Sequence, residues 1–258
     1  MSFPHTAAAA ARLDVLEATG STNADLLAHA ADEEGWPHLS VLLTEDQRSG
    51  RGRLDRTWVV PAGAAVAVSV LLRVPEVPLA VRGWIPLAAG AAMTEAVTAQ
   101  LPGADVGLKW PNDVLVGGRK ICGILAEASG ADAVVVGAGV NTAMTAEQLP
   151  VPTATSFAVE GVSCDADLLL AGYLARLDAF MAGLAAHGSA AASGLRDRVA
   201  ALCVTIGQDV RVELPDGRDL VGRATGLADD GCLLVRDGRD GTGERPIAAG
   251  DIVHLRPA

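Results

Sequence analysis

The chain has 258 residues, of which half are hydrophobic, and it carries a formal net charge of −11 at pH 7. A chain of this length buries enough apolar surface for one sizeable domain and a second, small one. An acidic protein repels a phosphate backbone unless its basic residues are concentrated in one place, so we expect no nucleic-acid partner.

The sequence shows neither a secretion signal nor an apolar run that reaches the length of a membrane span. No basic stretch near the N-terminus leads into an apolar run with a small-residue cleavage site. The longest apolar runs, such as residues 64–72, are shorter than the roughly 20 residues that cross a bilayer. The four cysteines stand singly, at positions 122, 164, 203 and 232. We therefore expect a cytoplasmic protein with reduced thiols, no membrane contact and no metal held by the protein alone.

The first 200 residues alternate helical and strand patterns, which predicts one α+β domain. Ser21-Thr22-Asn23 is typical of a helix cap and precedes helically spaced leucines. The stretch Gly117-Gly118-Arg119-Lys120 separates two short apolar runs and so predicts a β-hairpin. Helices are predicted at residues 21–34, 84–101 and 165–186, and strands at residues 39–45, 64–73, 114–116, 121–127 and 133–139.

After residue 203 the pattern changes to short strands with tight turns. Strands are predicted at residues 204–213, 219–228, 231–237 and 251–255, with turns at residues 215–217 and 229–231. Several short strands in so small a block are typical of a small all-β barrel. We therefore divide the chain into a main domain of residues 1–200 and a β-barrel domain of residues 201–258, with residues 185–194 as a helix end or linker.

The stretch from Gln47 to Trp58 concentrates positive charge in an acidic protein. It reads Gln-Arg-Ser-Gly-Arg-Gly-Arg-Leu-Asp-Arg-Thr-Trp, with four arginines. The arginine guanidinium donates in a planar fork to phosphate or carboxylate. Gly50 and Gly52 let backbone N–H groups approach a ligand. The stretch fits an anion site, and it fits an exposed, solvated loop equally well.

A second group of polar residues lies at the predicted hairpin. Lys109-Trp110-Pro111-Asn112-Asp113 leads into its first strand, and Lys120 begins its second strand, which continues through Gly123. A hairpin would bring the Asp113 carboxylate and the Lys120 ammonium to one site. Taken alone, a lysine at a turn is usually a solvated surface charge.

A glycine-containing stretch follows the predicted strand at residues 133–139. Gly137-Ala138-Gly139-Val140-Asn141 lacks the third glycine and the following helix of a dinucleotide-binding fingerprint, so we exclude a Rossmann fold. Taken alone, this stretch is the glycine-rich end of a strand, and Ser21-Thr22-Asn23 is a helix cap rather than a ligand site.

In their order and spacing, these stretches together resemble the catalytic domain of biotin protein ligases. That family has Ser-Thr-Asn, then Gln followed by Gly-Arg-Gly-Arg and a Trp, then Lys-Trp-Pro-Asn-Asp, then Lys with Gly-Ile-Leu, then Gly-x-Gly-x-Asn. Each part stands here in that order between about residues 14 and 159. The resemblance implies an α+β fold, a mixed sheet with helices like class II aminoacyl-tRNA synthetases, followed by a small C-terminal all-β barrel. Residue 55 is Asp where family members commonly have Gly, which leaves the arginines in place.

The resemblance also assigns roles to the matching residues. We expect Lys120, Arg53 and Asp113 to be catalytic, with Asp113 positioning or deprotonating the acceptor amine unless it binds ribose or Lys109 instead. The residues implied to contact biotin or its adenylate, or to support the nucleotide site, are Ser21, Thr22, Asn23, Gln47, Gly50, Arg51, Gly52, Arg53, Trp58, Lys109, Trp110, Asn112, Lys120, Gly123 and Asn141.

By the same resemblance the substrates are biotin and ATP, with Mg²⁺ held by the nucleotide's phosphates rather than by a protein cage. The implied partner is a biotin carboxyl carrier domain of an acyl-CoA or pyruvate carboxylase. Some family members begin with a DNA-binding helix-turn-helix, but only about a dozen residues precede the match here, so we expect a monofunctional ligase that does not repress transcription. The oligomeric state stays open between a monomer and a weak dimer.

Two other functions remain open on the sequence alone. A lipoate ligase shares the chemistry and the broad fold, but the Gly-Arg-Gly-Arg run with its following Trp favours biotin. A non-catalytic biotin-binding sensor would need neither Lys120 nor the loop arginines, so their presence favours an enzyme.

Overall fold

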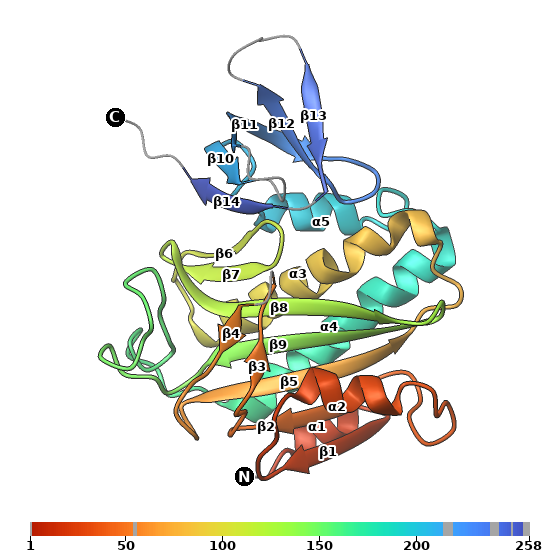
Figure 1. Ribbon diagram of the computed structural model, residues 1–258, viewed down its shortest axis with the longest axis vertical. Coiled ribbons are helices and arrows are strands. Elements are labelled where there is room, and N and C mark those ends of the chain that lie inside the picture. The colour runs from red at the N-terminus through yellow and green to blue at the C-terminus, as the bar shows by residue number, and fades with distance from the viewer. Residues whose placement is uncertain (1, 54–55, 214–218, 238–242, 249, 255–258) are drawn as a thin grey trace.

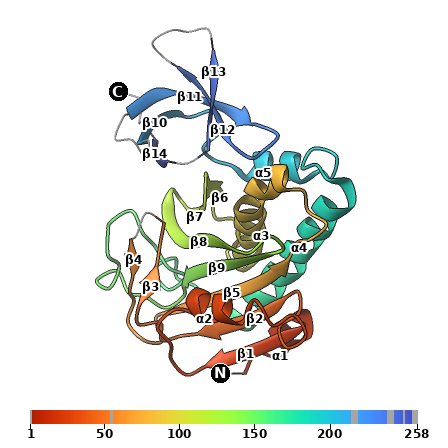
Figure 2. The ribbon, with the colours of Figure 1, turned by 45° about the vertical axis from the view of Figure 1, so that its right-hand side comes forward.

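Two β-sheets dominate the computed structural model, a seven-stranded sheet and a smaller C-terminal sheet (Figures 1 and 2). The structure describes residues 2–53, 56–213, 219–237, 243–248 and 250–254. The order in the large sheet is β1-β2-β5-β9-β8-β7-β6, with β1 and β2 parallel and every other neighbouring pair antiparallel. The predicted mixed sheet is confirmed. Its strands are β1 (Arg12–Leu16), β2 (Ser40–Thr44), β5 (Ala65–Arg73), β6 (Val106–Lys109), β7 (Asp113–Val116), β8 (Arg119–Ser129) and β9 (Ala133–Asn141).

Helices lie on both faces of this sheet, and its strands β2, β5 and β9 are buried except for one residue each in β5 and β9. In β2, Val41 and Leu43 point into the main core, whereas Leu42 joins a second cluster with Leu26 of the helix α2 (Thr22–His29). This alternation follows from the two-residue period of a strand. The helices α3 (Ile85–Gln100) and α4 (Ala166–His187) lie against each other on the main-core side.

Helix α2 begins where the sequence predicts and ends earlier. The Ser21 hydroxyl accepts a hydrogen bond from the Ala24 N–H, as a capping residue does. The helix ends at His29 instead of residue 34. The Arg73 guanidinium donates hydrogen bonds to the Ala30 and Trp36 carbonyls, and these bonds hold the chain in a turn.

Helix α4 runs from an Asp165 cap to Gly188, which adopts the left-handed conformation (φ +62°) that ends many helices. Among the described residues it is the one helix long and apolar enough to cross a membrane, by length and composition alone. Our expectation that no apolar run reaches that length did not register this helix, because Asp167, Arg176 and Asp178 interrupt its apolar residues. Its buried residues belong to the main core, as in the core helix of a globular protein.

The C-terminal sheet is antiparallel throughout, with the strand order β13-β12-β11-β10-β14. The predicted all-β character is confirmed, and the described pairings leave β13 and β14 at opposite edges. The turn at residues 229–231 is present, whereas the turn predicted at 215–217, residue 255 of the last predicted strand and residue 55 lie outside the described residues. The strands are β10 (Asp209–Glu213), β11 (Asp219–Leu227), β12 (Leu233–Asp237), β13 (Glu244–Ile247) and β14 (Asp251–His254).

Several short elements were not predicted. They are the helices α1 (Pro4–Ala9) and α5 (Leu195–Leu202), the 3₁₀ helix η1 (Leu79–Trp84), and the strands β1, β6 and β13, together with β3 (Gly50–Arg51) and β4 (Thr57–Trp58), which form a small hairpin inside the arginine-rich stretch. Each is too short for its residue pattern to show a period.

Candidate functional site

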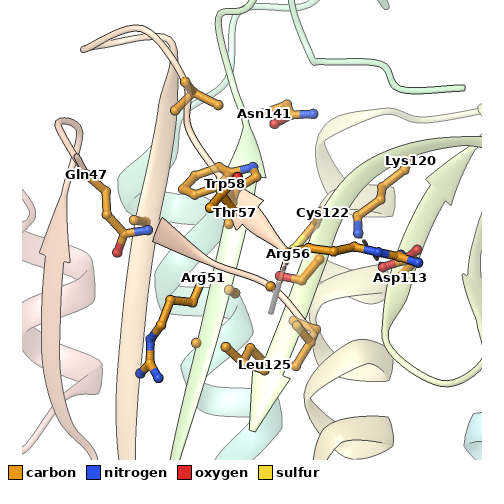
Figure 3. Close-up of a pocket in the computed structure, with 18 of the residues that line it drawn as sticks. Gln47, Arg51, Arg56, Thr57, Trp58, Asp113, Lys120, Cys122, Leu125 and Asn141 are labelled. Atoms are coloured by element: carbon orange, nitrogen blue, oxygen red, sulfur yellow. Dashed lines mark hydrogen bonds and ion pairs between the residues drawn. The ribbon is translucent and has the colours of Figure 1, made fainter. Parts of the chain in front are cut away.

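A cavity of about 340 Å³ opens between the β3–β4 hairpin and the strands β8 and β9 (Figure 3). Four basic side chains, Arg51, Arg53, Arg56 and Lys120, line it, while Asp113 is the one carboxylate among the described residues that line it. In a protein with a net charge of −11, this local excess of positive charge indicates a site for an anionic ligand. The solvated-loop alternative for the arginine-rich stretch is therefore not supported.

One end of the cavity is built from uncharged polar groups around Gln47. The Gln47 side-chain oxygen accepts hydrogen bonds from the Thr22 N–H (2.9 Å) and the Thr22 hydroxyl (3.1 Å). Because both bonds fix which way the amide points, the Gln47 Nε2 donor stays on the side of the cavity. Ser21, Thr22, Asn23 and Gln47 are all nearly buried, so this end of the cavity is shielded from solvent.

Asn23 organises the wall beside this end. Its Nδ2 donates to the Leu125 carbonyl (3.2 Å) and to the Glu127 carboxylate (2.8 Å), and its Oδ1 accepts from the Ser69 hydroxyl (2.5 Å). Both amide hydrogens are thus taken by protein acceptors. We infer that Asn23 shapes the cavity rather than offering a free hydrogen to a ligand.

The loop arginines have different partners. Arg51 pairs with Glu127 at 2.9 Å, so its guanidinium points away from Lys120 in Figure 3. Arg53 donates to the Asn112 side-chain oxygen (3.1 Å) and to the Gly250 carbonyl of the C-terminal sheet (3.5 Å). Burial lowers the pKa of Arg53, with neighbouring Asp113 acting in the opposite direction. Because arginine titrates far above neutral pH, it keeps its charge here.

The predicted β7–β8 hairpin is confirmed and brings the expected pair together. Lys120 Nζ lies 2.5 Å from Asp113 Oδ1, and Figure 3 shows the two side chains facing each other beside Arg56. On the side away from β7, the Lys120 backbone is held by residues 153–155. Its N–H donates to the Thr153 carbonyl and its carbonyl accepts from the Thr155 N–H, both at 2.8 Å. The ammonium therefore projects from a backbone fixed on both edges.

Lys109 and Trp110 lie behind the cavity, since neither is among the described residues that line it. The Trp110 indole is 2% exposed and donates its N–H to the Gly231 carbonyl of the C-terminal sheet (3.2 Å). Burial lowers the pKa of Lys109, and the nearby Asp113 carboxylate partly offsets this effect. Lys109 and Lys120 are the two lysines of the whole chain, so both stand at this site.

The Gly-x-Gly stretch is explained by close packing on β9. A Cβ atom added to Gly137 would lie 2.2 Å from the Asn23 Oδ1, and one added to Gly139 would lie 2.9 Å from the Trp58 ring. Gly50 is equally constrained, since its Cβ would lie 2.2 Å from the Trp58 carbonyl. These glycines make room for side chains that line the cavity. Asn141, at the end of β9, donates to the Thr155 carbonyl (2.9 Å) and so anchors the loop that forms another wall.

The remaining predicted residues Gly52, Asn112 and Gly123 also line the cavity. Sequence reasoning missed Arg56, Ser69, Glu127 and the wall at residues 144–154. A signal existed for Ser69, which is the one hydroxyl in the apolar run of β5 and is fully buried. Within the described residues, no three His, Cys, Asp or Glu side chains gather as a metal site.

Comparison with known proteins matches both sheets to one family. Residues 15–141 match the model of the biotin/lipoate A/B protein ligase family, and residues 205–255 match the biotin protein ligase C-terminal domain. A biotin--[acetyl-CoA-carboxylase] ligase of Mycobacterium tuberculosis is 42% identical over 248 residues, which are 95% of this chain and 90% of that protein. The chain belongs to the biotin/lipoate A/B protein ligase family.

Other relatives in this family agree in sequence and fold. The bifunctional ligase/repressor BirA of Bacillus subtilis is 28% identical over 231 residues, which are 86% of this chain and 67% of that protein. A structure of the biotin protein ligase from Aquifex aeolicus in complex with biotin and ATP superimposes with a TM-score of 0.77 at 24% identity, covering 96% of this chain and all of that one. These structural neighbours have the class II synthetase-like fold, which confirms the fold that the resemblance implied.

The packing of Gly137 against Asn23 leads to a prediction about ligand binding. We expect Gly137→Ala to displace the Asn23 amide and so to weaken the binding of biotin, used as the probe, by about ten-fold, which corresponds to about 1.4 kcal/mol. Isothermal titration calorimetry measures the change. Gly226→Ala is the matched control, because nothing lies within 4 Å of its added Cβ atom. Equal affinities in the two variants would contradict a role for Asn23 in shaping the cavity.

Proposed function

We propose that the protein activates biotin with ATP to biotinyl-5′-AMP and transfers the biotin to a lysine of a biotin carboxyl carrier domain. The observation that carries this proposal is the composition of one cavity. A shielded amide-lined end around Gln47 suits a neutral polar ring, while the end around Lys120 and Arg53 suits a carboxylate and a triphosphate. Biotin with ATP presents these groups, and the Aquifex aeolicus relative is described in complex with both.

The first half-reaction joins two anions. The biotin carboxylate attacks the α-phosphorus of ATP, an acyl–phosphate bond forms, and pyrophosphate leaves with its electron pair. Charge repulsion opposes this approach, and Lys120 and Arg53 offset it by stabilising the negative charge that develops on the phosphates. Hydrogen bonds on both sides of the Lys120 backbone fix the point from which its ammonium reaches the phosphates.

Mg²⁺ would accompany the nucleotide in this scheme. Asp113 is the one described carboxylate lining the cavity, and it is already paired with Lys120, so the protein alone supplies too few oxygen ligands for a metal. The triphosphate would provide most of the ligands. When bound, the ion would neutralise phosphate charge during attack.

The second half-reaction needs a neutral amine, whereas a lysine in water is largely protonated at pH 7. We assign Asp113 the role of positioning or deprotonating the acceptor lysine, because it is the carboxylate of the cavity. The amine then attacks the acyl carbonyl, an amide forms and AMP leaves. In this structure the Lys120 ammonium is paired with the Asp113 carboxylate. A bound phosphate would compete for the ammonium and so leave the carboxylate available to the acceptor amine.

The other assignments follow the geometry. We propose that Ser21, Thr22 and Gln47 hold the ring of biotin, that Trp58 packs on it, and that Asn141 supports the nucleotide wall. The acceptor would belong to an acyl-CoA or pyruvate carboxylase, and the reaction would take place in the cytoplasm, where the four free thiols stay reduced. We also propose the division into a ligase domain of residues 1–200 and a C-terminal domain of residues 201–258.

The alternatives are disfavoured by specific observations. A non-catalytic sensor would have no use for a lysine and a carboxylate held 2.5 Å apart inside its ligand cavity. A lipoate ligase is disfavoured because the similarity extends to the C-terminal domain of biotin protein ligases and because the relatives found are biotin ligases.

The direct test is incubation with biotin, Mg²⁺-ATP and a purified carrier domain, followed by intact-mass analysis of the carrier. We expect a single biotin-sized mass increase that requires ATP. Lipoate in place of biotin is the control, and an increase with lipoate alone would replace the proposed substrate. A carrier that stays unmodified under all conditions would refute the proposal.

Lys120→Ala removes a positive charge from the place where negative charge develops. We expect biotin-dependent ATP–pyrophosphate exchange to fall about 10²–10³-fold, the usual loss for one such group. Arg119→Ala is the neighbouring control, because Arg119 pairs with Glu160 and does not line the cavity. Near-normal exchange by Lys120→Ala would contradict the assignment.

Asp113→Asn separates the two half-reactions. If the carboxylate handles the acceptor amine, transfer from preformed adenylate slows about 10²-fold or more, while adenylate synthesis changes much less. Single-turnover assays measure each step. Equal losses in both steps would show that Asp113 serves the nucleotide site or the structure instead.

A further inference from the structure

Two buried indoles donate their N–H groups to one turn of the C-terminal sheet. Trp84 Nε1 donates to the Asp229 carbonyl at 2.8 Å, and Trp110 Nε1 donates to the Gly231 carbonyl at 3.2 Å. This turn, residues 229–231, joins β11 to β12. Both indoles are at most 2% exposed, and a buried indole N–H that loses its acceptor is costly. The two bonds therefore fix where the turn lies.

The backbone of the turn also packs closely against the backbone at Gly83. A Cβ atom on Gly83 would lie 2.3 Å from the Asp230 carbonyl oxygen. Gly231 adopts φ +88°, and a Cβ atom there would lie 3.1 Å from the Gly83 carbonyl oxygen. At this turn the C-terminal sheet thus meets the large sheet's domain through a close backbone contact as well as through the two indoles.

The two indoles differ in what they are attached to. Trp110 directly follows β6 and stands two residues before Asn112, which accepts from Arg53. Trp84 ends η1 at the start of α3, and no described residue of η1 or α3 lines the cavity. The bond from Trp110 therefore connects the turn to a segment of the site, whereas the bond from Trp84 connects it to elements outside the site.

The outer edge of β6 is held by the chain that enters the C-terminal sheet. The Val204 N–H donates to the Leu108 carbonyl at 2.9 Å, and the Trp110 N–H donates to the Thr205 hydroxyl at 3.1 Å. The strand that leads to Asn112 and Asp113 has no further strand beside it in the described structure. Its placement depends on these contacts from residues 203–205 and from the turn.

We propose that Trp110 is a positioning residue for the ligase reaction. Its bond to Gly231 fixes the segment from Trp110 to Asp113, so that Asn112 holds Arg53 and Asp113 meets Lys120. No described residue beyond Ala154 lines the cavity. The C-terminal sheet therefore acts on the chemistry through this segment, together with the Gly250 carbonyl that accepts from Arg53.

This role predicts a separation of kinetic constants. A shift of the segment misplaces the groups that stabilise developing charge, which lowers kcat. The amide-lined end around Gln47 and Thr22 is held by its own hydrogen bonds, so the KM for biotin stays nearly constant. A residue that merely stabilises the fold would change neither constant in the folded fraction.

The test compares Trp110→Phe with Trp84→Phe in the full chain, by biotin-dependent ATP–pyrophosphate exchange. Each variant loses one indole N–H bond to the same turn and keeps an aromatic ring. We expect kcat to fall about ten-fold in Trp110→Phe, as small misplacements in active sites do, with the KM for biotin within two-fold of wild type. We expect Trp84→Phe to keep kcat within two-fold, and urea unfolding should show that both proteins are folded.

Thr205→Val supplies a second, independent variant, since it removes the acceptor of the Trp110 backbone N–H and keeps the side-chain shape. It should lower kcat in the same way, even if Trp110→Phe does not fold. Equal loss of kcat in Trp84→Phe, or unchanged kcat in Trp110→Phe and Thr205→Val, would overturn the inference. The inference rests on the proposed ligase activity: absence of exchange in the wild type would refute that activity, whereas wild-type exchange with unchanged variants would refute the positioning role alone.

Discussion

The ion pair between Lys120 and Asp113 is the interaction around which the site is arranged. A partly exposed pair of this kind contributes little to stability by itself. Its importance is electrostatic, because Asp113 is the described carboxylate in a cavity lined by four cations. Without it, Arg53, Arg56 and Lys120 would repel one another in the absence of a ligand. The pair thus keeps an anion site intact until an anion replaces the carboxylate as the partner of the cations.

The position of this ion pair depends on contacts from parts of the chain that are distant in sequence. The β7–β8 register places Lys120 near Asp113, with an irregularity between Val114 and Leu115 that shifts the pairing by one residue. Residues 153–155 fix the Lys120 backbone, and Asn141 fixes residue 155 in turn. A short hairpin would not hold this geometry alone, so the large sheet and its neighbouring loops are part of the site.

The residues of the site were more predictable than the way in which they work. Motif order pointed to Gln47, Arg53, Asp113 and Lys120, because these residues lie in short stretches with unusual charge. It did not show that the Asn23 amide is hydrogen-bonded to Ser69 and Glu127, or that the Trp110 indole is hydrogen-bonded to the C-terminal sheet. These partners lie 46 to 121 residues apart in the sequence, so they leave no local pattern. Helix α4 was predicted from its helical period and β5 from its long apolar run, whereas β6 and β13 exist through pairing with other strands.

The near absence of lysine limits how far the enzyme can be acylated by its own intermediate. An acyl-adenylate reacts with any neutral amine it meets, and a protein surface usually offers many. In this chain the basic residues outside the site are arginines and histidines, and a guanidinium stays protonated and unreactive. An intermediate that escapes therefore finds no lysine on the outside of the molecule that made it. Stray acylation of lysine would therefore fall on the surrounding proteins rather than on the outer surface of the catalyst itself.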